Sequence, residues 1–141
     1  MPEAAQSIDG TLRILRTICA ALLLSMVAYV WIAEKIAVHP AQAMDRTFST
    51  SIGILVVAIV VGAFVVRAKM IRPALDTLQT KPEDIPSLGR WRAGTILSYA
   101  LAESTVLFGL VLRTTGATRA QSASYYVVGP LLLLLWWPRR P

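Results

Sequence analysis

The stretch SIGILVVAIVVGAFVV, residues 51–66, decides the fold class of this chain. After Ser51 it contains no charged or strongly polar side chain. A helix on the surface of a soluble domain carries one polar face, so a soluble bundle would need regularly spaced polar positions here. About 20 mostly apolar residues are what an α-helix needs to cross roughly 30 Å of hydrocarbon. The stretch therefore predicts a transmembrane helix, and a soluble four-helix bundle is the less favoured alternative.

The rest of the 141-residue chain has the same character, with 55% hydrophobic and 16% charged residues. This composition departs from that of soluble proteins in the direction of membrane proteins. Four apolar runs are long enough to span a bilayer, at about residues 14–35, 47–70, 91–112 and 119–137. We predict an all-α fold, a four-transmembrane-helix bundle running up-down-up-down. It forms one integral membrane domain over residues 1–141.

The basic residues predict the orientation, because Lys and Arg concentrate on the cytoplasmic side of membrane proteins. With the N-terminus inside, ten of the fourteen lie in inner segments: Arg13, Arg16, Arg67, Lys69, Arg72, Lys81, Arg90, Arg92, Arg139 and Arg140. Four lie outside: Lys35, Arg46, Arg113 and Arg119. We therefore expect both termini and a loop at 71–90 in the cytoplasm of a multi-pass protein, in a bacterial inner or plasma membrane. Within this loop Pro73 and Pro82 can each start a short interfacial helix. The net charge of +6 is then explained by the lipid bilayer as partner, without nucleic acid.

Aromatic and basic side chains near the span ends are expected to anchor the bundle at the head groups. Amphipathic rings gather at both membrane–water interfaces. The predicted interface anchors are Trp31, Trp91, Trp136, Trp137, Arg139 and Arg140.

The first span could also be read as a signal peptide, because Ala41-Gln42-Ala43 has the small-x-small form of a cleavage site. A signal core is about 7 to 15 residues long, whereas this apolar run is longer and is separated from the site by Glu34 and Lys35. We expect the span to be retained.

Residue types that carry catalysis are scarce. The single histidine, His39, has no second His or Cys near it, so we expect a solvated loop residue and no metal site. The sequence contains no Cys/His pair and no phosphate-binding glycine loop. We predict no catalytic residue, no cofactor and no enzymatic activity.

One carboxylate, Glu103, interrupts the third apolar run near the expected centre of the bilayer. A charged group at that depth costs about 2.5 to 3.5 kcal/mol on insertion scales, so it should face protein and be neutral. Small residues at helical spacing mark a predicted packing face: Gly94, Ser98, Ala102, Thr105 and Gly109. No span interior holds a cation, so the candidate hydrogen-bond partners are the hydroxyls of Ser25, Tyr29, Tyr99 and Thr105.

The string ALAESTVLFGLVL, Ala100 to Leu112, resembles the carboxylate-bearing helix of the ring proteolipid, subunit c, of rotary ATP synthases. The resemblance covers 13 of 141 residues. It implies that Glu103 is an ion-carrying carboxylate that exchanges a proton or sodium ion. The other apolar runs differ from that family, since 52–66 contains only Gly53 and Gly62 where the family's partner helix is rich in glycine.

Two functions follow from these residues. The first is a structural or accessory subunit that associates with itself or with a larger membrane complex, with Glu103 as a hydrogen-bonding group between helices. The second is a proton or cation relay in a transporter or rotor-like assembly, with Glu103 as the relay group, because an ionisable residue inside a membrane is a functional candidate by default.

Overall fold

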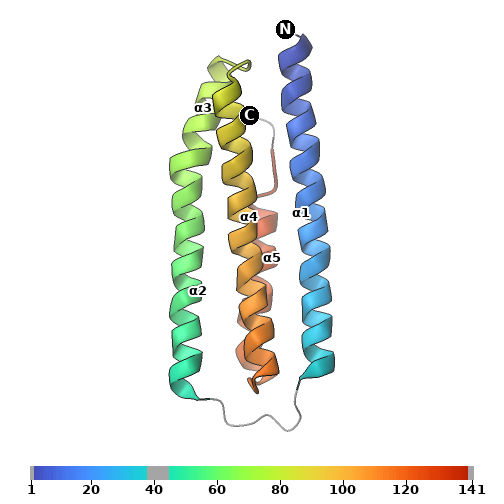
Figure 1. Cartoon of the computed structure of the whole chain (residues 1–141), viewed down its shortest axis with the longest axis vertical. Coiled ribbons are helices and arrows are strands. Elements are labelled where there is room, and N and C mark those ends of the chain that lie inside the picture. The colour runs from blue at the N-terminus through green and yellow to red at the C-terminus, as the bar shows by residue number, and fades with distance from the viewer. Residues whose placement is uncertain (1, 38–44, 140–141) are drawn as a thin grey trace.

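The computed structural model describes residues 2–37 and 45–139, and the regular structure in those ranges is entirely helical (Figure 1). The elements are α1 (Pro2–Ile36), α2 (Arg46–Val66), a π-helical turn η1 (Arg67–Ile71), α3 (Arg72–Thr80), α4 (Ile85–Thr114) and α5 (Arg119–Leu135). The prediction of an all-α fold is confirmed for this part of the chain. The predictions for His39, the Ala41–Ala43 site and Arg140 lie outside the described residues.

Three helical segments are long and apolar enough to cross a membrane: Ile8–Ile36, Arg46–Thr80 and Ile85–Thr114. Large apolar side chains cover their outer faces, with Leu24 73% and Ile54 67% exposed. Water would make such a surface costly, whereas lipid tails solvate it. These helices indicate a membrane protein.

Helix α4 organises the fold, because it packs against α1, α2 and α5. In Figure 1 it lies between α1 and α2, with α5 behind it, and consecutive long helices run in opposite directions. The turn between α4 and α5 contains Gly116, whose φ of 109° is a left-handed conformation that glycine adopts freely.

The segment 71–90, predicted as a loop with short helices starting at Pro73 and Pro82, is mostly helical, and only Lys81–Asp84 separates α3 from α4. The helix expected at Pro73 is α3, whereas no helix starts at Pro82. Pro73 does not end the helix that precedes it, because η1 adjusts the hydrogen bonding: the Arg72 N–H donates to the Arg67 carbonyl, five residues back. An apolar face keeps this segment folded. Ile71 and Leu78 belong to a core cluster that also contains Trp91 and residues of α1.

Asp84 is the N-cap residue of α4 and lies outside the apolar spans. Its carboxylate accepts a hydrogen bond of 2.9 Å from the Ser87 N–H. Hydrogen bonds from the side chain and the backbone of Ser87 lower the pKa of Asp84 below its ordinary value of 3.8. A carboxyl group whose pKa is lowered by folding stabilises the fold above its unfolded pKa, and this contribution is lost as the pH falls through the folded pKa.

We therefore expect the first turn of α4 to lose protection from hydrogen exchange as the pH falls below about 3.8. The change Asp84→Asn keeps an acceptor but removes the titration, so its protection, corrected for intrinsic exchange rates, should not change over that range. Identical profiles for the two proteins would show that this carboxylate does not cap the helix.

Candidate functional site

The carboxyl group of Glu103 joins α4 to α1. Its Oε1 atom accepts hydrogen bonds from the Ser25 hydroxyl at 2.9 Å and from the Tyr29 hydroxyl at 3.1 Å. Ser25 and Tyr29 lie four positions apart on α1, so both project from the same side of that helix. Of the four candidate hydroxyls, the other two bond elsewhere: Tyr99 donates to the Trp136 carbonyl and Thr105 to the Ala102 carbonyl.

The depth of Glu103 follows from the charges on its own helix. It lies 11 positions after Arg92 and 10 before Arg113. At 1.5 Å per residue these separations are about 16 and 15 Å, half of a hydrocarbon layer roughly 30 Å thick. If the two arginines mark the two interfaces, Glu103 lies at the middle of the membrane.

The two hydroxyls on α1 can serve either protonation state of Glu103. The Ser25 oxygen also lies 2.8 Å from the Leu22 carbonyl, and a serine has only one proton to donate. When Glu103 is ionised, Ser25 and Tyr29 both donate to it. When Glu103 is neutral, it can donate to Ser25, which then donates to Leu22, while Tyr29 still donates to Oε1. Neither state leaves a hydroxyl without a partner.

The other oxygen of Glu103, Oε2, faces outward. The side chain is only partly buried, and within the part of the chain that the structure describes every hydrogen bond to this carboxyl group ends on Oε1. No buried polar side-chain atom lacks a partner among the same residues, so Oε2 lies at the surface of the molecule. One oxygen of the carboxyl group is thus bonded within the chain, whereas the other has no hydrogen-bond partner among the described residues.

All five residues of the predicted packing face are buried against neighbouring elements: Gly94, Ser98, Ala102, Thr105 and Gly109. A methyl group on Gly94 would meet the Met70 and Ile71 side chains, and one on Gly109 would meet Tyr126. This face therefore holds α4 against η1 and α5. Glu103 lies at its border, on the flank that faces α1.

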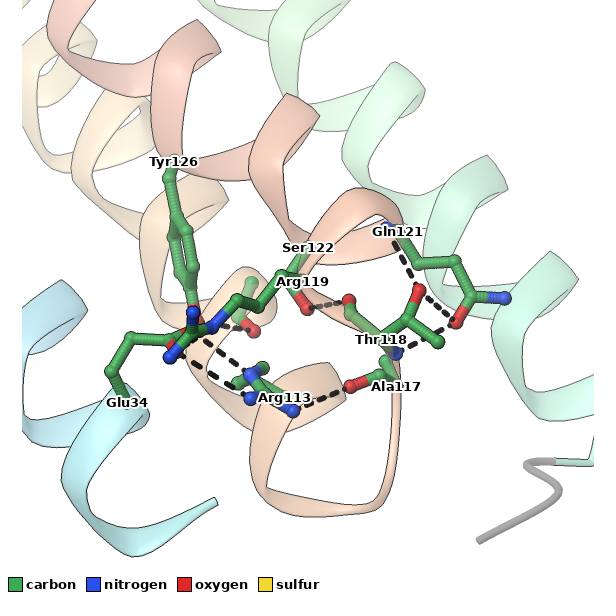
Figure 2. A network of polar contacts seen from close by, with 9 residues as sticks. Glu34, Arg113, Ala117, Thr118, Arg119, Gln121, Ser122 and Tyr126 are labelled. Carbon is green, nitrogen blue, oxygen red and sulfur yellow. Dashed lines mark hydrogen bonds and ion pairs between the residues drawn. The ribbon is translucent and has the colours of Figure 1, made fainter. Parts of the chain in front are cut away.

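A second group of polar side chains joins the C-terminal end of α1 to the end of α4 and the start of α5 (Figure 2). The Arg113 Nε lies 2.9 Å from the Glu34 carboxylate, and its Nη1 donates to the Ala117 carbonyl at 2.9 Å. Arg119 pairs with the other oxygen of Glu34. The Arg113 side chain is 4% exposed, whereas that of Arg119 is 75% exposed. We call Glu34, Arg113 and Arg119 the end clasp.

The end clasp was not predicted, because Arg113 and Arg119 were counted only as basic residues of the outer side and Glu34 only as a charge that follows the first apolar run. A signal was nevertheless present. Glu34 ends one apolar run and Arg113 ends another, and alternating directions bring these two ends to the same side of the molecule. Opposite charges at the same depth on adjacent helices are expected to pair when one of them is buried.

Some of the predicted interface anchors are exposed and others are buried. Trp31 and Trp137 are 64% and 38% exposed, so their rings can reach head groups. Trp91 and Trp136 are 3% and 5% exposed and belong to core clusters, so their rings pack inside the molecule. Arg139 is exposed. An anchoring role stays a prediction for the exposed side chains.

Within residues 2–37 and 45–139, no three His, Cys, Asp or Glu side chains come together in a way that could hold a metal ion. The buried Cys19 lies in the apolar core cluster with Tyr99. No protein family model matches the chain, and neither does a curated protein or a solved structure.

Proposed function

We propose that the chain is a small polytopic membrane protein that acts as an interaction subunit and has no catalysis of its own. In this proposal α1, α2, α4 and α5 cross the membrane up-down-up-down, with both termini in the cytoplasm. The 17 residues of α5 extend about 25 Å, the short end of the range for a span. The exposed apolar faces and the excess of basic residues at one end support this placement.

The outward-facing oxygen of Glu103 carries the proposal. An acceptor that meets lipid at mid-membrane has no water to bond, and such a group is costly. A neighbouring helix that supplies a hydroxyl or amide donor would remove this cost. We therefore propose that a second copy of the chain or another membrane subunit covers Glu103 at the flank between α1 and α4.

Two substitutions test this proposal. Glu103→Gln keeps the shape and the hydrogen-bonding capacity of the side chain, so we expect the oligomer or complex to stay intact. Glu103→Leu removes both, and we expect dissociation to become easier by about 1 kcal/mol, roughly fivefold in the dissociation constant. Native mass spectrometry in detergent and a pull-down of the full chain measure the assembly. Equal assembly in the Leu and Gln variants would contradict the proposal.

A relay of protons or cations is the second candidate, and one observation favours it. The Ser25 and Tyr29 hydroxyls can bond both the neutral and the ionised carboxyl group, so the site would tolerate exchange. This is the behaviour that the resemblance to the rotary ring proteolipid implies. A relay predicts pH-dependent labelling of Glu103 by a hydrophobic carbodiimide, lost in Glu103→Gln. An absence of labelling at every pH would remove this candidate.

A further inference from the structure

A cavity of about 190 Å³ lies at the end of the molecule where α5 stops. It is bounded by η1, α3, the first half of α4, the last residue of α5 and the residues that follow α5. Its polar lining includes Arg67 and Arg139, and its apolar lining includes Ile71, Leu75 and Leu135. Among the residues that the structure describes, no Asp or Glu lines it. The lining of the cavity therefore combines two cations with apolar side chains.

Arg67 is fixed in this cavity. It is the first residue of η1, and its guanidinium carbon lies 4.9 Å from the centre of the Trp136 ring. Phe64 holds this ring in turn, with its own ring 5.2 Å away in an edge-on arrangement. Stacking of this kind fixes the plane of a guanidinium and leaves its N–H groups free to donate. Because π-helical turns often occur at functional sites, the position of Arg67 in one agrees with a binding role.

This arginine has no acidic partner in the part of the chain that the structure describes. The two salt bridges found there both involve Glu34, which lies near the C-terminus of α1, at the opposite end of the molecule from Arg67. Arg67 is partly buried. A partly buried cation without a counter-ion is unfavourable, so the site favours an anion from outside the chain.

We propose that this cavity binds the phosphate group of an anionic phospholipid from the cytoplasmic leaflet. Arg67 and Arg139 would donate hydrogen bonds to the phosphate oxygens, with Arg67 held in place by Trp136. The apolar side chains would contact the glycerol and the first methylene groups of the tails. Ten of the fourteen Lys and Arg residues belong to the predicted cytoplasmic side, and basic pockets between helices at that level bind anionic head groups. A lipid can contact both the cationic and the apolar side chains of this lining, whereas a free phosphate can contact only the cationic ones.

The test uses the full chain, purified in a neutral detergent and supplied with phosphatidylglycerol or phosphatidylcholine. Native mass spectrometry counts the bound lipids. We expect the wild type to retain phosphatidylglycerol in preference to phosphatidylcholine, and Arg67→Gln to weaken phosphatidylglycerol binding about tenfold, as expected for a charge-assisted contact. Arg67→Lys keeps the charge but loses the planar set of N–H donors of the guanidinium, so we expect phosphatidylglycerol binding to weaken by only a few fold.

Lys69→Gln is the matched control, since Lys69 is an exposed cation of the same η1 turn that does not line the cavity. It should bind lipid as the wild type does. Equal losses in Lys69→Gln and Arg67→Gln would overturn the proposal, because they would show only a general charge effect. Unchanged binding in Arg67→Lys and Arg67→Gln would also overturn it. Circular dichroism checks that each variant is folded.

Inorganic phosphate distinguishes the source of the anion. We expect millimolar phosphate to leave the bound phosphatidylglycerol in place. Displacement of the lipid by phosphate alone would assign the site to a soluble phosphorylated ligand and overturn the lipid proposal. The Glu103→Leu variant should keep full lipid binding, so a failure of the interaction-subunit proposal would leave this test unaffected.

Discussion

Replacement of Glu34 by Gln is expected to destabilise the protein by about 3 kcal/mol, because it leaves the Arg113 guanidinium buried without its counter-ion. Removal of one partner from a buried ion pair costs about 3 to 5 kcal/mol. We place this site at the low end because the Glu34 side chain is 27% exposed, so water reaches part of the pair. Thermal unfolding of the purified chain in detergent, followed by circular dichroism, measures the loss.

The control is Arg119→Gln, which removes the other cation of the end clasp. The Arg119 side chain is 75% exposed, and exposed ion pairs contribute about 0 to 1 kcal/mol. We also expect Glu34→Leu combined with Arg113→Leu to be more stable than Glu34→Gln alone, since no charge then remains buried. Equal losses for Glu34→Gln and Arg119→Gln would contradict the view that burial of Arg113 determines the cost.

These contacts explain how α1 stays on the rest of the molecule. Near its N-terminus Leu12 and Leu15 pack in the cluster around Trp91, at mid-length Ser25 and Tyr29 bond Glu103, and near its C-terminus Glu34 closes the end clasp. In lipid, apolar surfaces gain little by association, so hydrogen bonds and close packing set which helices pair. Polar contacts together with apolar packing therefore hold α1 against the rest of the molecule.

The helices themselves could be predicted from the sequence because hydrophobicity in long runs is a local property. The stretch 51–66 and the small residues of α4 need only their own neighbours to be interpreted. The extent of the helices was less accessible, since the mixed charges of 71–90 are typical of a loop and Pro73 indicated only a short helix there. There the apolar contacts of Ile71 and Leu78 with Trp91 outweigh the local signals. Such contacts join residues far apart in the chain, which one sequence does not reveal.

Contacts between residues far apart in the chain are also the reason why the polar sites could be predicted only in part. The sequence placed Glu103 near mid-membrane and gave four candidate hydroxyls, but the choice of Ser25 and Tyr29 depends on how α1 is rotated about its axis. The end clasp joins Glu34 to residues 79 and 85 positions away. The cavity proposed to bind a lipid depends on Trp136, whose indole was predicted to face the head groups and instead packs inside. Rotation of each helix was the missing information in all three cases.

Replacement of Gly129 by Ala is expected to destabilise the protein by about 2 to 3 kcal/mol, because α4 leaves no room for a side chain at this glycine of α5. An added Cβ would lie 2.5 Å from a methyl carbon of Val106 and 2.8 Å from the Ala102 carbonyl oxygen. The carbonyl belongs to the helix backbone and cannot move cheaply, so the two helices would have to separate. Thermal unfolding in detergent measures the effect, with hydrogen exchange along α5 as a local readout.

Gly62→Ala is the matched control, since a Cβ at that position of α2 meets nothing within 4 Å. Alanine is preferred over glycine inside a helix, so this variant should be as stable as the wild type or more stable by up to about 1 kcal/mol. The same preference for alanine acts at Gly129. The loss of stability expected for Gly129→Ala is therefore the cost of the clash minus this gain. If the two variants are equally stable, α5 does not approach α4 as closely as the packing of Gly129 requires, and the small-residue face of α4 would then have to serve a different neighbour.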